Sequence, residues 1–472
     1  MHKKMLNERF GHQTFRPGQE ETILSVLESK NTLAILPTAS GKSLTYQLPS
    51  YLFSGLTLIV SPLISLMEDQ VMQLRQQGEK RVVAYNSQLS IVEKKWVLNN
   101  LASYKFIFIS PEALNKDDVI KKLQAINLSL LVVDEAHCIS QWGIDFRPEY
   151  EQLNVAVRKI KPVKILALTA TANDEITKDI ENKLFDNGEI AIIRESVNRK
   201  NIAYLVEEPV NKINYLVELI DYHIGPGIIY FSSKKEAERV AQELSEKTGM
   251  RVSYYHGGQT AQERSLIQQQ FLKDELDVLC ATSAFGMGVN KKNIRYVVHY
   301  HLPSSLEAYA QESGRAGRDG KQSFSVILYQ PGDERLYAFQ TQELSEAIEH
   351  LKIYPDITKL SYDEELELYL KWQESIVAKL FSQAELTSQL ERKLEEKKLA
   401  LMNILTYLHT KECRRSFLLR HFQEKKQLKQ ENCCDNCGFC DKMLDKSSDK
   451  NFDEDDQSLQ WEQKLKNLFN IK

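Results

Sequence analysis

Residues 131–150 read LVVDEAHCISQWGIDFRPEY, and this stretch joins a predicted strand to a loop of charged and aromatic residues. The apolar run Leu131–Val133 predicts a short buried strand, and it stops at two adjacent carboxylates, Asp134 and Glu135. Aromatic and cationic residues follow after a short polar gap, namely Trp142, Phe146 and Arg147. One loop therefore carries both an acid pair at a strand end and an aromatic and cationic set.

The composition is that of a globular chain. Its 472 residues suit two or three domains, and no apolar run approaches the roughly 20 residues of a membrane span. The N-terminus MHKKMLNERF lacks the apolar core of a secretory signal, so we expect a cytoplasmic protein without a membrane partner. A formal net charge of -4 argues against a uniformly basic coat, so any nucleic-acid surface must be local.

Strand-like runs alternate with amphipathic segments from about residue 30, a pattern typical of parallel α/β layers. The first series of predicted strands is 32–36, 56–61, 106–110, 131–133 and 165–169. A second series follows at 227–231, 251–255, 277–281, 295–299 and 323–329. We therefore expect two consecutive α/β domains that meet near residues 205–212.

Helical patterns replace the strands beyond about residue 340. A leucine stripe at helical spacing predicts a helix hairpin that packs on itself, and it comprises Leu386, Leu390, Leu394, Leu401, Leu405 and Leu408. An acidic linker separates it from residues 458–472, where Trp461, Leu465, Leu468 and Phe469 fall on one helical face. We expect this last segment to dock on the core, with capture by a partner as the alternative.

The stretch PTASGKS follows the first predicted strand and suits phosphate binding. Backbone N–H groups at a helix start can cradle phosphate, Lys42 can reach the β and γ oxygens, and Ser43 can hold Mg²⁺. Alone the motif is weak, because Leu36 stands where the full P-loop pattern has glycine. With this loop upstream, Asp134 and Glu135 indicate a metal ligand and a water-orienting base rather than a simple helix cap.

Two arginines in AYAQESGRAGRDG (308–320) complete the phosphate-handling set. Arg315 and Arg318 are three residues apart, so we expect them on one helical face, directed at one anion. An arginine that neutralises transition-state phosphate charge is worth on the order of 10³–10⁵ in rate.

Cysteines crowd near the C-terminus and predict a metal site, because the chain shows no export signal. Cys434, Cys437 and Cys440 form C-x-x-C-x-x-C, and Cys413 supplies a distant fourth thiolate. Four cysteines make a closed, structural zinc site. Cys433 is an extra neighbour and a candidate spare thiol, whereas we expect Cys138 and Cys280 to be packed interior residues.

Taken in order, these motifs resemble the RecQ family of superfamily 2 DNA helicases. The matching segments are FGHQTFRPGQ (10–19), TASGKS (38–43), VSPLISLMEDQ (60–70), ISPE (109–112), DEAHCISQWGIDFRPEY (134–150), LTATA (168–172), GIIYFSS (227–233), CATSAFGMGVNKKNIRYVVH (280–299) and QESGRAGRDG (311–320). The resemblance implies an α/β fold of two tandem RecA-like parallel-sheet domains followed by a small helical zinc-binding domain. The implied bounds are 1–207, 208–340 and 341–444, with an acidic linker and amphipathic helix at 445–472, in a short bacterial form without winged-helix and HRDC domains.

The resemblance also implies roles for single residues. Arg16 and Gln19 would recognise adenine, with His12 stacked on the base. The cofactor site would comprise these three together with Thr38, Ala39, Ser40, Gly41, Lys42, Ser43 and Asp134, and the catalytic set would be Lys42, Asp134, Glu135, His137, Gln311, Arg315 and Arg318. Trp142, Phe146 and Arg147 match the family's aromatic-rich loop, which senses single-stranded DNA by base stacking. Backbone contacts to DNA are implied at the strand ends marked by Ser61, Pro62, Ser110, Phe231, Ser232 and Thr282.

We therefore expect an ATP-dependent DNA helicase that moves 3′ to 5′, with ATP, Mg²⁺ and structural Zn²⁺ as cofactors. Its expected partners are single-stranded, forked and tailed DNA, with single-stranded-DNA-binding protein or other repair proteins as candidates. The expected roles are DNA repair, recombination and fork maintenance at the nucleoid. The alternatives are an RNA helicase, or a DNA-stimulated ATPase or scaffold with weak unwinding.

Overall fold

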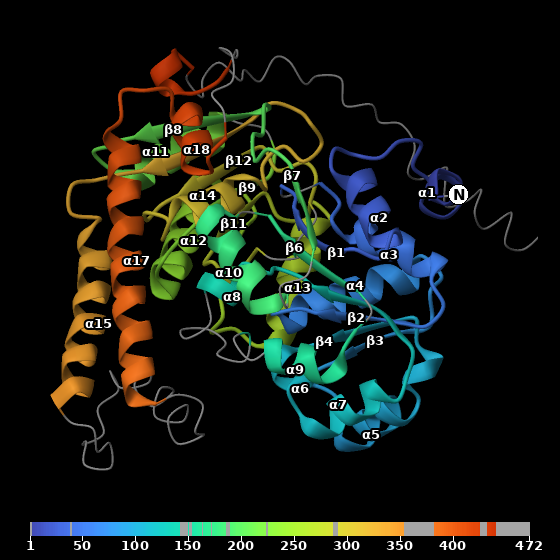
Figure 1. The fold of residues 1–472 in the computed structure, drawn as a ribbon. Helices are drawn as coiled ribbons and strands as arrows, with labels where there is room; N and C mark the ends of the chain where they lie inside the picture. The colour runs from blue at the N-terminus through green and yellow to red at the C-terminus, as the bar shows by residue number, and fades with distance from the viewer. Residues whose placement is uncertain are drawn as a thin grey trace, which may run out of the picture.

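The structure is a computed structural model of the chain. It describes residues 2–37, 40–141, 150, 153–162, 164–170, 172–185, 189–222, 225–286, 291–353, 382–424 and 432–439. Two parallel sheets and a C-terminal helical part make up this described portion (Figure 1).

The first sheet has seven described strands in the order β3-β4-β2-β5-β6-β1-β7, and every pairing in it is parallel. The strands are β1 (Asn31–Ile35), β2 (Leu56–Val60), β3 (Val82–Tyr85), β4 (Phe106–Ile109), β5 (Leu128–Val133), β6 (Ile165–Thr169) and β7 (Ile190–Arg194). Every residue of β5 is buried, which is what a continuous apolar run requires when helices cover both faces of a sheet.

Helices cover the two faces of this sheet in separate groups. Buried residues of α2 (Gln19–Leu27), α3 (Ser43–Leu52) and α4 (Ile64–Gln76) pack in one core. The opposite core takes residues from α5 (Ile91–Asn99), α7 (Asp117–Gln124), α9 (Leu153–Ile160) and α10 (Asp174–Leu184). The remaining elements of this half are α1 (His2–Phe10), η1 (Leu101–Ser103), α6 (Pro111–Leu114) and α8 (Cys138–Gln141).

The second sheet has six described strands in the order β10-β11-β9-β12-β13-β8, again all parallel. They are β8 (Ile202–Glu207), β9 (Gly227–Tyr230), β10 (Val252–Tyr255), β11 (Val278–Ala281), β12 (Tyr296–His299) and β13 (Ser323–Leu328). Residues of α11 (Lys212–Tyr222) and α12 (Lys234–Thr248) form the core on one face. The other face is covered by α13 (Ala261–Leu272), α14 (Leu306–Ser313) and the C-terminal helices.

The expected junction between the α/β units needs one correction. β8 pairs with β13 along its whole length, so the second sheet begins ahead of residue 208. Its sequence IAYLVE is an apolar edge strand with four buried and two half-buried residues. The edge strand β7, of half-buried and exposed residues, was also not predicted. These two strands follow each other without a helix between them, so they interrupt the alternation of strands and amphipathic segments on which the sequence analysis relied.

The helical part contains α15 (Arg335–Ile353) and α17 (Gln383–His409), which lie side by side (Figure 1). The whole leucine stripe lies in α17, where Leu390, Leu394 and Leu408 are buried. The contact with α15 agrees with the expected helix pair, whereas Leu408 packs in the core of the second sheet rather than within a hairpin that packs only on itself. Ser382 and Glu385 form a capping box that starts α17. The shorter α18 (Arg414–His421) and η5 (Asp435–Cys437) complete this part, while residues 458–472 lie outside the described residues.

The cysteine segment extends the second sheet beyond its edge strand. Tyr204 N donates to Cys433 O at 3.2 Å, and Val206 N donates to a carboxylate oxygen of Asp435 at 3.1 Å. Tyr204 and Cys434 also form an isolated parallel bridge. The helical part is therefore joined to the sheet through backbone hydrogen bonds as well as side-chain packing.

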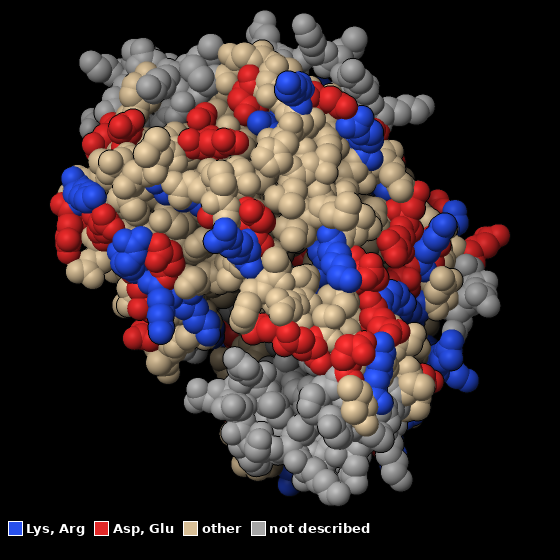
Figure 2. Space-filling view, turned by 90° about the vertical axis from the view of Figure 1, so that its left-hand side faces the viewer, with Lys and Arg blue, Asp and Glu red and all other residues tan. Residues whose placement is uncertain are grey.

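Opposite charges are mixed on the molecular surface. Figure 2 shows Lys and Arg interspersed with Asp and Glu over the face that carries α15 and α17. No helix of the described residues combines the length and apolarity needed to span a membrane.

Gly227 generates a stability prediction. A Cβ added to this residue of β9 would lie 1.9 Å from a ring carbon of Tyr296, its buried neighbour on β12. We expect Gly227→Ala to lower the free energy of unfolding by about 1–3 kcal/mol, because the packed ring must move. Urea denaturation measures this, with Gly257→Ala as the control, since no atom lies within 4 Å of its added Cβ. Equal unfolding midpoints for the two variants would contradict the packing argument.

Candidate nucleotide site and metal centre

The phosphate loop lies between β1 and α3 and is tied to Gln19 on α2. The Gln19 side-chain amide donates to the carbonyls of Ser40 at 2.7 Å and Gly41 at 3.1 Å. Its oxygen accepts from the Arg16 backbone N–H at 2.9 Å. Gly41 has φ +75°, and an added Cβ would lie 2.8 Å from the Gln19 amide nitrogen. The loop therefore depends on glycine at this position, both for its backbone and for this close approach.

The other residues expected to hold the nucleotide differ in their exposure and contacts. His12 and Arg16 are exposed, whereas Gln19 is buried against the loop. Ser43 begins α3, and its hydroxyl donates to Gln70 at 3.2 Å. Thr38 and Ala39 lie outside the described residues.

The acid pair stands at the carboxyl end of β5, facing the phosphate loop. Lys42 Nζ is 3.8 Å from Glu135 Oε1, and Nδ1 of His137 is 3.5 Å from Glu135 Oε2. The same His137 nitrogen lies 3.1 Å from the hydroxyl of Thr169, at the end of β6. The loop lysine, the acid pair and the LTATA segment thus meet at one edge of the sheet.

Burial and charge separate the two carboxyls. Burial, followed by the neighbouring Glu135 charge, raises the pKa of Asp134 to about 6. Burial alone would raise the pKa of Glu135, but the charges of Lys42, His137 and Arg315 outweigh it and lower that pKa. Glu135 is therefore the stronger acid of the pair and stays ionised to lower pH than Asp134, and a divalent cation would favour ionisation of both.

Arg315 and Arg318 come to this site from the second sheet. The prediction of one helical face is wrong, because α14 ends at Ser313 and both arginines follow in turns. Arg315 is buried and donates to the carbonyl of Gly286. Burial, followed by the charges of Arg315 and Arg199, lowers the pKa of Arg318 to about 9. Gln311, also expected in the catalytic set, is half-buried on α14.

Contacts between the two halves accompany this arrangement. The charge of Arg315 on the second half lowers the pKa of Glu135 on the first. The side-chain amide of Gln268 on α13 donates to Asp69 on α4 at 2.6 Å. The two sheets therefore meet with the phosphate-handling residues at their junction.

These residues fit a nucleotide with its metal. Among the described residues, buried polar atoms without a hydrogen-bond partner include the Ser40 hydroxyl, Glu135 Oε2 and Arg315 Nε. Buried polar atoms are nearly always paired in native proteins. A triphosphate supplies acceptors for the hydroxyl and the guanidinium, and Mg²⁺ or a water supplies a partner for the carboxylate.

The residues expected near DNA follow the carboxyl ends of strands in both sheets. Ser61 follows β2, Ser110 follows β4, Phe231 follows β9 and Thr282 follows β11. The Ser61 side chain is buried, and the Phe231 ring stacks on Tyr300 at 4.9 Å, so their side chains are directed into the protein. Pro62 is buried and Ser232 is exposed, while Trp142, Phe146 and Arg147 lie outside the described residues.

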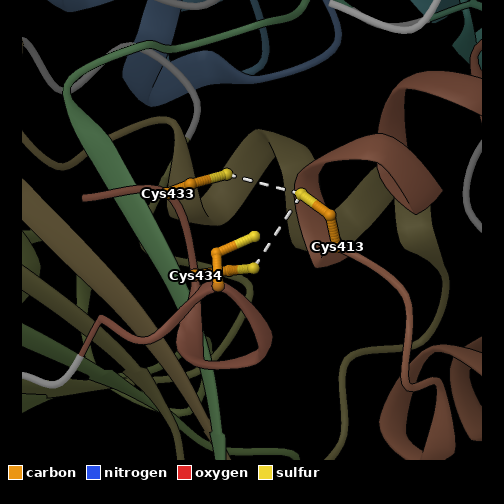
Figure 3. Close-up of side chains that lie close together, drawn as sticks. Cys413, Cys433 and Cys434 are labelled. Carbon is orange, nitrogen blue, oxygen red and sulfur yellow. Dashed lines mark hydrogen bonds between the residues drawn. The ribbon is translucent and has the colours of Figure 1, made fainter. Parts of the chain in front are cut away.

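The cysteines gather beside β8, as Figure 3 shows for three of them. Cys413 Sγ is 3.4 Å from Cys433 Sγ and 3.9 Å from Cys434 Sγ. The sulfurs of Cys413, Cys433, Cys434 and Cys437 all lie within 4.8 Å of one another. Zinc–sulfur bonds of about 2.3 Å place tetrahedral sulfurs about 3.8 Å apart, so the cluster suits Zn²⁺.

The identity of the fourth ligand stays a prediction. Cys440 lies outside the described residues, whereas Cys433, expected to be a spare thiol, is part of the cluster. The buried Cys433 sulfur also accepts from Arg415 Nε at 3.3 Å. Cys138 and Cys280 are buried elsewhere, which confirms their expected place in the interior.

Two parallel α/β units, with a phosphate loop and acid pair on one and paired arginines on the other, define a helicase-type motor ATPase. Solved structures share the fold: DEAD-box helicase Mss116 bound to ssRNA matches with a TM-score of 0.58 and 19% identity, covering 87% of this chain and 88% of that one. Helicase Lhr of Mycobacterium smegmatis, bound to ssDNA and AMP-PNP, also gives 0.58 at 19% identity, covering 84% and 56%. These similarities concern the fold alone.

Sequence comparisons are more specific. Family models for DEAD/DEAH box helicase, helicase conserved C-terminal domain and RecQ zinc-binding match residues 16–180, 211–320 and 373–441. Probable ATP-dependent DNA helicase RecS of Bacillus subtilis is 42% identical, covering 93% of this chain and 92% of the relative. ATP-dependent DNA helicase RecQ of the same organism is 38% identical, covering 93% and 66%. The chain therefore belongs to the RecQ family of ATP-dependent DNA helicases, and its cofactors are ATP, Mg²⁺ and structural Zn²⁺.

The crowded thiols generate a prediction about metal content. We expect Cys437→Ser and Cys440→Ser to lose zinc and to destabilise the helical part, since structural zinc contributes on the order of 10 kcal/mol of coupled folding free energy. Cys433→Ser should keep zinc, because Arg415 already supplies a partner to that sulfur. Metal analysis of the purified variants measures this. Zinc retained by Cys440→Ser and lost by Cys433→Ser would make Cys433 the fourth ligand instead.

Proposed function

We propose that this helicase couples ATP hydrolysis to 3′-to-5′ movement along single-stranded DNA and to duplex unwinding. The observation that carries the proposal is the junction between the halves, where Arg315 of the second half lies close enough to Glu135 of the first for its charge to lower the pKa of that carboxyl. Hydrolysis between two such halves makes their contact depend on the bound nucleotide. A strand held across both sheets would then be moved by each opening and closing.

We assign the chemical roles from the same geometry. Lys42 and the loop amides hold the phosphates, and Ser43 and Asp134 hold Mg²⁺, which neutralises phosphate charge when bound. Glu135 orients the attacking water and takes its proton, because it lies beside Lys42 and His137 and Lys42 helps to keep it ionised. His137 and Gln311 support that site, and Arg315 and Arg318 stabilise charge that develops on the transferred phosphate.

We assign adenine recognition to His12, Arg16 and Gln19, as the motif order implies. Gln19 would then serve two purposes, since its side chain also supports the phosphate loop. Thr38, Ala39, Ser40 and Gly41 complete the nucleotide site in this proposal. Cys413, Cys434, Cys437 and Cys440 are the proposed zinc ligands.

The proposed DNA path runs over the carboxyl ends of the strands. Backbone groups near Ser61, Pro62, Ser110, Phe231, Ser232 and Thr282 would contact phosphates, which positions the strand without reading its sequence. Trp142, Phe146 and Arg147 would sense the strand by stacking and transmit its presence to the adjoining acid pair. The substrates would be single-stranded, forked and tailed DNA, and single-stranded-DNA-binding protein is a candidate partner.

The proposed cellular role is DNA repair, recombination and fork maintenance, in the cytoplasm at the nucleoid. The proposed functional divisions of the chain are 1–201 for ATP binding, 202–340 for the helicase C-terminal domain, 341–444 for zinc binding and 445–472 for the linker and last helix. The first boundary lies ahead of Ile202 because β8 belongs to the second sheet.

Substitutions of Lys42 and Glu135 should impair ATP turnover in different ways. We expect Lys42→Ala to abolish ATP turnover and to leave the protein folded, because Lys42 pairs with Glu135 and belongs to neither hydrophobic core of the first sheet. Glu135→Gln should still bind Mg-nucleotide but turn it over at least about 100-fold more slowly, since the base is lost. Fluorescent-nucleotide titration and steady-state turnover measure the two effects. Binding and turnover that fall in parallel for Glu135→Gln would remove its role as a base.

Strand displacement tests the proposed direction. Labelled duplexes with a 3′ tail, a 5′ tail, a fork or blunt ends are compared in the presence of ATP, with Lys42→Ala as the inactive control. We expect displacement from 3′-tailed and forked DNA only. Preference for the 5′ tail would reverse the polarity, and ATPase stimulation by RNA alone would favour the RNA helicase alternative. ATPase activity that DNA stimulates without strand displacement would favour the alternative of a DNA-stimulated ATPase or scaffold with weak unwinding.

A further inference from the structure

Arg415 joins the cysteine cluster to the segment that connects the two sheets. Its side chain is buried at the start of α18, two residues after Cys413. Arg415 Nε donates to Cys433 Sγ at 3.3 Å, while Nη1 donates to Asn198 Oδ1 at 2.7 Å and to Arg199 O at 2.8 Å. Its second terminal nitrogen donates to Ile202 O. One guanidinium thus contacts both Cys433, which adjoins the proposed ligand Cys434, and the connecting segment.

Arg415 has sulfur, amide and backbone-carbonyl partners rather than a carboxylate. The neighbouring Arg414 pairs with Asp435 at 2.5 Å, but no described carboxylate forms an ion pair with Arg415. A buried cation needs an anion close by. Four thiolates around Zn²⁺ would retain a net negative charge, so the loaded centre would place an anion next to Cys433 and this guanidinium.

The Arg199 side chain connects this segment to the turns at 314–319, which contain Arg315 and Arg318. Its Nη1 donates to Gly314 O at 2.8 Å, and its Nη2 donates to Ala316 O at 3.0 Å and Gly317 O at 2.8 Å. These carbonyls lie just beyond the end of α14, where a helix leaves carbonyls without intrahelical partners. They bracket Arg315 and immediately precede Arg318, so Arg199 holds the backbone from which both side chains extend.

A second contact fixes the start of the connecting segment. Glu424, just after α18, accepts from the Ser196 hydroxyl and from Val197 N at 2.6 Å. The segment 196–202 is therefore attached to the helical part at both ends. Its own position then depends on that part being folded around its metal.

We infer that Arg415 and Arg199 are positioning residues that couple the zinc centre to the Arg315 and Arg318 pair through the segment 196–202. In this inference, zinc binding fixes the position of the Arg415 side chain, and Arg415 fixes the backbone at Asn198 and Arg199. The Arg199 side chain then fixes the turns that carry Arg315 and Arg318. This inference rests on the proposed role of Arg315 and Arg318 at the phosphates. It assigns the metal centre a part in ATP turnover at a distance from the nucleotide.

The variants compared are Arg199→Ala, Arg415→Lys, Asn198→Ala and the double variant Arg199→Ala/Arg415→Lys. Arg415→Lys keeps the charge but cannot bridge the sulfur and three acceptors, and Asn198→Ala weakens the same contact without changing the helical part. Arg420→Gln is the matched control, since Arg420 lies exposed on the same helix and pairs with Glu412. Arg318→Ala serves as the reference for the arginine pair.

Each variant is assayed for zinc content, melting temperature, and kcat and KM for ATP at saturating single-stranded DNA. We expect Arg199→Ala and Arg415→Lys to lower kcat about 10- to 100-fold, as small displacements of catalytic groups do, with KM changed less than about threefold. Zinc should stay at the unmutated level, and Asn198→Ala should lower kcat less. The double variant should be no slower than Arg199→Ala, because the two residues act in series.

Several outcomes would overturn the inference. If the losses in kcat multiply in the double variant, the two arginines act independently. If Arg415→Lys loses zinc or fails to fold, Asn198→Ala decides, and an unmutated kcat for that variant rejects the coupling. If Arg318→Ala lowers kcat and Arg199→Ala does not, the inference fails while the proposed function stands. An unchanged kcat for Arg318→Ala would instead remove the proposed role of the arginine pair.

Discussion

The burial of Glu135 as an ionised carboxyl between Lys42 and the arginine turns is the interaction on which the site depends. A buried charge is costly unless opposite charges surround it, and here those charges come from two separate sheets. Lys42 belongs to the loop after β1, whereas Arg315 follows α14 of the second half. The contact between the halves is therefore also the charge balance of the site. This explains why the chemistry requires both parallel sheets rather than one.

The parallel order of the strands brings these residues together. The carboxyl ends of parallel strands share one edge, so residues from β1, β5 and β6 meet although long stretches of sequence separate them. His137 and Thr169 illustrate this, since they contact each other across adjacent strands. The same rule places Ser61, Ser110 and Thr282 at strand ends. The fold thus supplies two kinds of edge position, which we propose serve phosphate and a nucleic-acid strand, respectively.

Much of this arrangement could be predicted from the sequence where the chemistry is local. The run Leu131–Val133 marked β5 because every residue of that strand is buried, and the GKS loop marked the start of α3. The edge strands β7 and β8 were not predicted, because they follow each other without a helix between them and so interrupt the alternation of strands and amphipathic segments. The end of α14 at Ser313 was missed because the turns beyond it are held by Arg199, which is distant in sequence. The place of Cys433 in the cluster was not predicted for a similar reason, because its sulfur contacts that of Cys413, which is distant in sequence.

The hydrogen bonds between β8 and the cysteine segment have a consequence for solubility. β8 is an edge strand of the second sheet, and an uncovered strand edge is a template on which another chain can pair. Tyr204 and Val206 direct their backbone N–H groups at Cys433 and Asp435, so the thiol-rich segment covers part of that edge. Loss of the metal would thus do more than loosen a peripheral domain. It would uncover backbone donors of a strand that is already folded, and metal-depleted molecules would associate edge to edge before the sheets themselves unfold.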